Sequence, residues 1–218
     1  MMKCRVLSTC LMLCFSGMNL AISGNADAQQ TDTNLIATGD WSKAVSDSPG
    51  PALRGRLLVY DERGPSAGNH AGVYLELQHV FQGVWANPIE VYFEFGSRNN
   101  LQFEMRNKLD QPIPQEPVFT SAPAPNPYWV TLPCESTVRL RVDKLEGFPS
   151  KPKGLAILVP GGCWIMPPNA TNDFFLSATF TPPKDHPSSL HYHVWQGTLN
   201  LPKVKIPVKK PDQGAGKA

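Results

Sequence analysis

Three histidines near the C-terminal end of the chain have the spacing of a metal site. His191 and His193 are two residues apart, so in a strand both imidazoles point to one face, with Cα atoms about 7 Å apart. His186, or Asp185 beside it, returns from a Pro-Ser-Ser turn as a third ligand. Such a set suits copper or zinc in an exported protein. The alternative is a group of solvated histidines, because the stretch follows Pro182-Pro183 and has no Cys or Met at ligand spacing.

Cys134 and Cys163 are the only cysteines after residue 28. In an oxidising compartment an even number of cysteines predicts a disulfide. The bond would close a loop of about 30 residues and stabilise the fold by ~3 kcal/mol on the chain-entropy account. The alternative is two buried thiols on neighbouring strands, because spacing alone does not show that the Cα atoms come close enough.

The motifs of the common catalytic and cofactor sites are missing from the sequence. It has no nucleophile elbow, no glycine-rich phosphate loop, no zinc-binding cysteine pairs and no HExxH. We therefore expect no cofactor and a protein that is not an enzyme. The enzyme hypothesis that stays open is a secreted hydrolase whose site is assembled from distant loops.

The first 28 residues have the order of a signal peptide. Lys3 and Arg5 precede an apolar stretch, and Ala26-Asp27-Ala28 supplies the small residues of a cleavage site. We expect cleavage after Ala28, a mature chain that begins at Gln29, and a secreted or periplasmic location. No later segment approaches the ~20 apolar residues of a transmembrane helix, so we expect no membrane span in the mature chain.

The expected mature chain is almost neutral. Removing residues 1–28 takes away two of the 20 basic residues and one of the 18 acidic residues. A balance this even creates no field that would favour nucleic acid as a partner. We expect a partner that is a protein or a carbohydrate, and a non-enzymatic role in binding or in the structure of the cell envelope.

Apolar and polar residues alternate with a period of two in four segments, as in strands with one buried face. The segments are 73–77, 89–95, 101–105 and 138–142, and further strands are expected at 53–60, 155–159, 174–181 and 198–208. Pro202 and Pro207 favour an edge or a break in the last of these. No segment has an apolar stripe at helical spacing.

The side chains of these strands divide into two sets. Trp129, Trp164 and Trp195 are expected as core anchors. The residues with outward parity are Tyr74, Glu76, Glu90, Tyr92, Glu94 and Glu104. We interpret the glutamates as a solvated face. The tyrosines form an exposed aromatic platform for a carbohydrate or protein partner, or they are covered by a loop.

Residues 111–133 contain seven prolines, which cannot donate the hydrogen bonds of a central strand. We interpret this segment as a stiff crossover between two sheets; the alternative is a ligand for a proline-recognising partner. Together the patterns predict an all-β, immunoglobulin-like antiparallel β-sandwich over residues 51–208 with long proline-rich connections. A polar lead-in over 29–50 precedes this domain, and a disordered tail over 209–218 follows it.

One part of the chain resembles a known family. Its segments are Val73–Val80, Asn87–Phe93, Leu101–Arg106, Thr131–Pro133 and Ser136–Val142. Their order is similar to that in small bacterial immunoglobulin-like domains, which include the BsuPI-type proteinase-inhibitor domains and many exported proteins. The resemblance covers residues 73–142 and implies the sandwich fold, whereas proteinase inhibition would follow from it only by analogy.

Overall fold

Two long antiparallel strands, β3 (Ala52–Asp61) and β4 (His70–Val80), pair without interruption in the computed structural model of the protein. Alternate side chains of a strand point to opposite faces. On β3 the inward positions include Leu53, Leu57 and Val59, all fully buried. The sheet that contains this pair therefore has an apolar inner face and a separate outer face.

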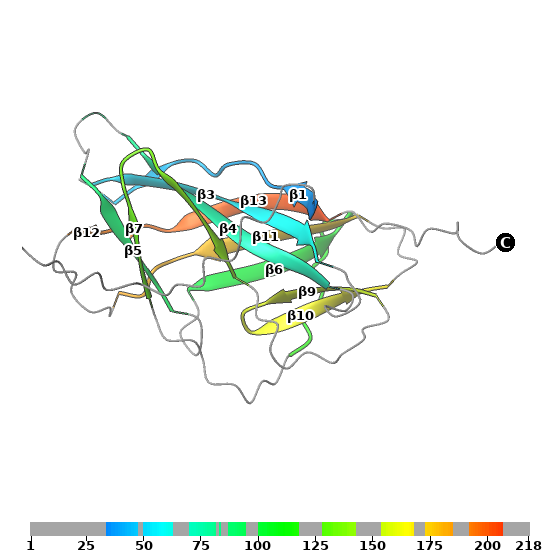
Figure 1. Cartoon of the computed structure of the whole chain (residues 1–218). Coiled ribbons are helices and arrows are strands. Elements are labelled where there is room, and N and C mark those ends of the chain that lie inside the picture. The colour runs from blue at the N-terminus through cyan, green and yellow to red at the C-terminus, as the bar shows by residue number, and fades with distance from the viewer. Residues whose placement is uncertain are drawn as a thin grey trace, which may run out of the picture. The chain divides into compact units, whose positions relative to one another are not determined.

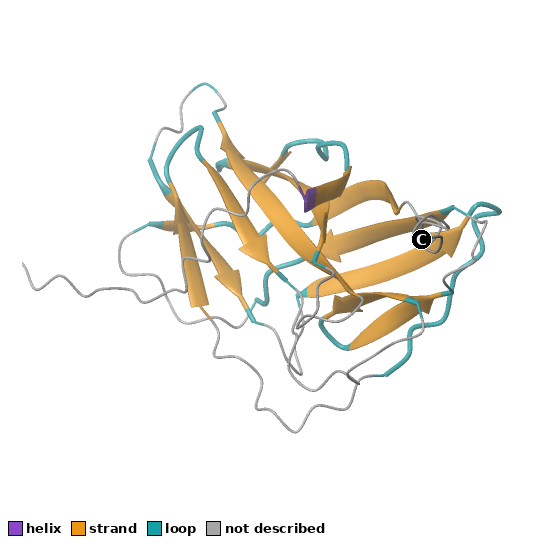
Figure 2. Ribbon diagram, turned by 45° about the vertical axis from the view of Figure 1, so that its right-hand side comes forward, coloured by secondary structure: helices purple, strands orange, loops and turns teal. Residues whose placement is uncertain are grey.

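The structure describes residues 34–47, 50–62, 70–81, 83, 87–94, 100–117, 128–142, 154–167, 173–184 and 192–206. All of them belong to one compact unit, residues 32–218. Apart from a short helical turn at Asn34, drawn purple in Figure 2, their regular structure consists of strands. Among these residues no helix has the length and apolarity that a membrane span requires.

Five more strands complete the sheet of β3 and β4 (Figure 1). β1 (Leu35–Thr38) and β2 (Val45–Ser46) both pair with the free edge of β3. β8 (Thr137–Arg141) and β9 (Leu155–Val159) pair with β4, and β10 (Gly162–Met166) pairs with β9.

Two three-stranded sheets account for the other described strands. One has the order β13 (Leu199–Ile206), β11 (Phe174–Phe180), β6 (Leu101–Asn107). The other has the order β12 (His193–Val194), β5 (Ile89–Phe93), β7 (Tyr128–Leu132). β13 packs against β3 of the large sheet. This contact is close because Gly55 has no side chain, and a Cβ atom there would meet the methyl groups of Leu201 and Leu77.

Stacked aromatic rings join the sheets in one core. Phe93 of β5 stacks on Phe180 of β11 with ring centroids 5.0 Å apart, and Phe180 stacks on Trp195 at 6.1 Å. Trp195 and Phe180 are fully buried, and the indole N–H of Trp195 donates to the carbonyl oxygen of Val45. Tyr128 also stacks on Phe93, with ring centroids 5.4 Å apart, and burial raises the pKa of its hydroxyl to about 12. These rings therefore link the sheet of β5 to the sheet of β11 by apolar contact.

The structure confirms the nearly all-β composition and the alternating strands expected from the sequence. β13 is an edge strand, and its pairing with β11 shifts register between Leu201 and Val204, around Pro202. Trp164 and Trp195 are core residues as predicted, whereas Trp129 is only half-buried. The predicted signal peptide with Ala28 and the predicted tail at 209–218 lie outside the described residues.

Two expectations about connecting segments need correction. The predicted lead-in contributes β1 and β2 to the large sheet. The proline-rich segment contains the paired strand β7, because residues 128–132 are free of proline and donate normally to β5. Residues 118–127 of that segment lie outside the described residues.

We predict that Phe180→Ala lowers the free energy of unfolding by about 3–5 kcal/mol, because it removes the central ring of the aromatic stack. Chemical denaturation measures this loss. Phe175→Ala is the matched control, because Phe175 lies on the same strand and is only half-buried on the opposite face. Equal losses in the two variants would contradict the proposed importance of the stack.

Candidate functional site

The outer face of β3, β4 and β8 carries a group of charged residues in cross-strand register. We call this group the arginine face. Its members are Arg54, Arg56, Glu62, Glu76, Arg139 and Arg141. Register places Arg56 directly opposite Glu76, and Glu76 directly opposite Arg139. Strand pairing therefore brings together side chains that are up to 87 positions apart in the sequence.

Glu76 is the central acceptor of the arginine face and is only 5% exposed. Its Oε2 accepts from Nε of Arg56 at 2.5 Å, and its Oε1 accepts from Nε and Nη2 of Arg139 at 3.3 and 3.1 Å. A buried carboxylate is stable only when paired and hydrogen-bonded. Glu76 thus holds both arginines in fixed positions.

Glu62 has the same role at the other end of the face. It accepts from Arg141 at 2.5 Å and from the hydroxyl of Tyr74 at 3.1 Å, and it lies 3.2 Å from Nε2 of His70. Gly72 makes this arrangement possible, because a Cβ atom there would overlap the Glu62 carboxylate. The carboxylate occupies the space of the missing side chain.

A small apolar cluster lies beneath the arginines. It contains Leu58, Tyr60 and Tyr74, and the two rings meet edge to face at 5.0 Å. Nη1 of Arg139 donates to the Tyr60 hydroxyl at 2.5 Å, and its guanidinium lies 5.6 Å from the ring centroid. All three guanidinium nitrogens of Arg139 are therefore engaged inside the protein.

Trp41 covers the other end of the arginine face. The chain before β2 runs along the edge of β3, where Ser42 N donates to Gly55 O at 2.8 Å and Gly55 N donates to Ser42 Oγ at 3.0 Å. This pair of hydrogen bonds fixes the position of the neighbouring Trp41. Its ring lies against the guanidinium groups of Arg54 and Arg56, at 4.8 and 4.4 Å from the ring centroid.

Arg54 and Arg56 keep most of their donors available. Nε of Arg54 donates to Oε1 of Gln78 at 2.7 Å, and Nε of Arg56 donates to Glu76. Among the residues that the structure describes, no group accepts from the terminal nitrogens of either side chain, and no carboxylate pairs with Arg54. Two ordered guanidinium groups with unused donors are suited to binding an anion.

The structure describes only one of the predicted metal ligands. His193 lies in β12, and its Nε2 is 2.9 Å from Oδ2 of Asp47, which also accepts from Gln196 N at 2.8 Å. His186, His191 and Asp185 lie outside the described residues. No group of three or more potential ligands occurs in the described ranges. Metal binding by His186, His191 and His193 therefore stays a prediction.

The structure contains no disulfide between Cys134 and Cys163, which lie along different parts of β4. Cys134 follows β7, two residues before Ser136, whose carbonyl oxygen accepts from His79 N near the end of β4. Cys163 pairs with β9, which lies along the beginning of β4. The positions on β4 beside which the two cysteines lie are roughly 20 Å apart, at about 3.3 Å per residue of strand. A disulfide needs Cα atoms within about 7 Å.

The prediction that the outward glutamates are solvated needs correction at Glu76, and the structure decides between the two alternatives for Tyr74 and Tyr92. Glu76 and Tyr74 have the predicted outward parity, but both are buried: Arg56 and Arg139 bond to Glu76, and Arg141 lies over the ring of Tyr74. Tyr92 is also buried and packs against Trp129 with centroids 4.8 Å apart. Both tyrosines are therefore covered, which was the second alternative, and neither is an exposed platform. Glu104 is solvated as predicted, with a side chain that is 47% exposed.

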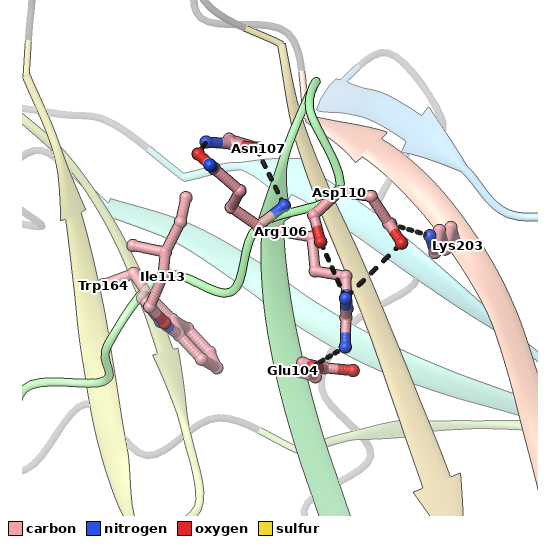
Figure 3. Close-up of polar contacts among 8 residues, drawn as sticks. Glu104, Arg106, Asn107, Asp110, Ile113, Trp164 and Lys203 are labelled. Atoms are coloured by element: carbon pink, nitrogen blue, oxygen red, sulfur yellow. Dashed lines mark hydrogen bonds and ion pairs between the residues drawn. The ribbon is translucent and has the colours of Figure 1, made fainter.

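A second polar cluster surrounds the turn after β6 (Figure 3). Asn107 Oδ1 accepts from Leu109 N at 2.9 Å and from Gln111 N at 3.0 Å, and Arg106 Nη1 donates to the carbonyl oxygen of Asp110 at 2.7 Å. Asp110 has a left-handed backbone, with φ of 61°.

The charged groups of this turn pair with one another. The carboxylate of Asp110 pairs with Lys203 and Arg106, and Arg106 also pairs with Glu104. The side chain of Leu109 is 77% exposed at the tip. Because these charges are neutralised locally, the turn is a weaker candidate for ligand binding than the arginine face.

Comparison of the chain with protein-family models, with curated proteins and with solved structures finds no match. The resemblance to BsuPI-type domains therefore stays an expectation. The arginine face was missed by sequence reasoning, which placed Trp41 in a lead-in. The signal that was present is the alternation of Arg54 and Arg56 with apolar residues on β3.

We predict that a chain beginning at Gln29 contains two thiols. Denaturation without reductant, in the presence of an alkylating agent, should add two adducts to the intact mass. In the native protein Cys163 should react slowly, because burial and the nearby Glu116 carboxylate raise the pKa of its thiol. Adducts that appear only after reduction would show that a disulfide forms despite the strand arrangement.

We predict that Lys203→Met raises the pKa of Asp110. The hydrogen bond and charge of Lys203, with a smaller contribution from Arg106, lower that pKa in the folded protein. A lowered pKa stabilises the fold above the ordinary Asp value of about 3.9, and this stabilisation is lost as the pH falls through the folded value. NMR titration of the Asp110 carboxyl measures the shift. Lys205→Met, which removes the partner of Asp173, should leave it unchanged.

Proposed function

We propose that this protein is an exported, non-catalytic binding protein that recognises an anionic ligand through the arginine face. The observation that carries the proposal is the availability of ordered guanidinium donors at Arg54 and Arg56. Their positions are fixed by Trp41, Gln78 and Glu76 before any ligand arrives. Binding then loses less conformational entropy than it would with free arginine side chains.

The state of the carboxylates also supports binding over hydrolysis. A general acid or base must reach a substrate proton within hydrogen-bond distance. Glu76 directs its oxygens to two guanidinium groups, and Glu62 directs its oxygens to Arg141, Tyr74 and His70. In this arrangement the acidic groups orient the arginines. A hydrolase with a site built from distant loops is the alternative function.

We propose that the domain is an immunoglobulin-like sandwich and that export delivers it to the periplasm or the exterior. The packing of β13 against β3 supports the sandwich, and so do the antiparallel pairs β3–β4 and β11–β13, although β9 pairs with β4 and β12 with β5 in parallel. The sequence of residues 1–28 supports export. A binding role for such a domain agrees with its site on a rigid sheet face.

We predict that polyanions bind to the chain that begins at Gln29 and that neutral dextran does not. Polyphosphate and polyglutamate, titrated at low ionic strength, should shift backbone amide NMR signals of β3, β4 and β8. Binding should weaken as salt is added, because exposed charges are screened. Shifts confined to other strands, or no shifts with either polymer, would overturn the proposed function.

A further inference from the structure

We infer that Arg54 and Arg56 form a subsite for one doubly charged tetrahedral oxyanion, either a phosphate or a sulfate group of the ligand. This inference rests on the proposed function and names the chemical group that the arginine face recognises. It depends on three features of the two arginines beside Trp41: the positive charge left after internal pairing, the limited separation of the two guanidinium groups, and their fixed orientation.

The charge balance at these arginines favours an anion. Arg54 has a neutral partner, Gln78, so its full charge is uncompensated among the described residues. Arg56 shares Glu76 with Arg139, so the three groups together keep one positive charge. Arg54, Arg56, Arg139 and Glu76 together thus carry two net positive charges. This charge matches a dianion better than a single carboxylate.

The upper limit on the separation of the two guanidinium groups leaves them within reach of a single bridging group. Both lie against the same Trp41 ring, at 4.8 and 4.4 Å from its centroid. Their central carbons are therefore within about 9 Å of each other. A tetrahedral oxyanion that accepts hydrogen bonds on two sides spans roughly 8 Å between such carbons. One phosphate or sulfate can contact both side chains.

The orientation of the two side chains is fixed by contacts that leave their outer edges unused. Each Nε atom donates inward, to Gln78 or to Glu76. The indole ring of Trp41 lies against both guanidinium groups and restricts their rotation. Arg56 has a side chain that is 27% exposed, so its terminal nitrogens reach solvent from a partly buried position. An anion there is less screened than at a fully exposed lysine.

The experiment uses inorganic phosphate, sulfate and acetate as probes of the chain that begins at Gln29. Titration at low ionic strength, followed by NMR of the arginine Nε–H groups, should show saturable shifts of Arg54 and Arg56 with phosphate and with sulfate. Acetate should bind at least about fivefold more weakly. Acetate binding as tight as phosphate binding would overturn the assignment to a tetrahedral dianion.

The variant Arg54→Gln tests the subsite without disturbing a buried ion pair, because no described carboxylate pairs with Arg54. It should weaken phosphate binding about tenfold, and Arg54→Gln with Arg56→Gln should abolish it. Arg54→Lys keeps the charge and loses the planar fork, so it should recover less than half of the affinity. Full recovery by lysine would show that charge alone attracts the anion.

The matched control for the double variant is Lys108→Gln with Lys205→Gln. It also removes two positive charges, but at residues outside β3, β4 and β8. It should change phosphate binding less than twofold. If polyanions shift β3, β4 and β8 while Arg54→Gln has no effect, the proposed function stands and the subsite is wrong. If no anion shifts these strands, both proposals fail.

Discussion

The antiparallel pairing of β3 with β4 sets which side chains are buried and which face outward in the largest sheet. Its register runs without a shift from Ala52 opposite Val80 to Asp61 opposite Ala71. Because side chains alternate between the two faces, this one register buries the leucines and valines inward and places the arginines outward. A slip of one residue would move Arg54 and Arg56 into the core.

The outer face shows how charged residues are accommodated on a largely covered surface. Desolvating Glu76 is costly, and the hydrogen bonds from Arg56 and Arg139 offset that cost. The same bonds hold the guanidinium groups rigid. Trp41 orders the guanidinium group of Arg54 without a carboxylate, so this side chain is held in place and its positive charge stays available.

Several parts of the fold were predictable because they depend on local patterns. Alternation within one strand reports its two faces, so β4, β5, β6 and β8 were expected close to their observed places. The short strands β1 and β2 were not expected, because their pairing depends on the free edge of β3 rather than on their own composition. β7 was hidden by the prolines around it.

Local alternation along the chain was enough to predict the nearly all-β composition and the outward parity of Tyr74 and Glu76, since both follow from the period of a strand. The burial of these outward residues and the contact of Trp41 with two arginines arise only when the strands pair and pack. The placement of Cys134 and Cys163 near opposite ends of β4 arises in the same way. The physical reason is that burial and proximity are set by neighbouring strands, which come from distant parts of the chain and leave no mark on the local pattern.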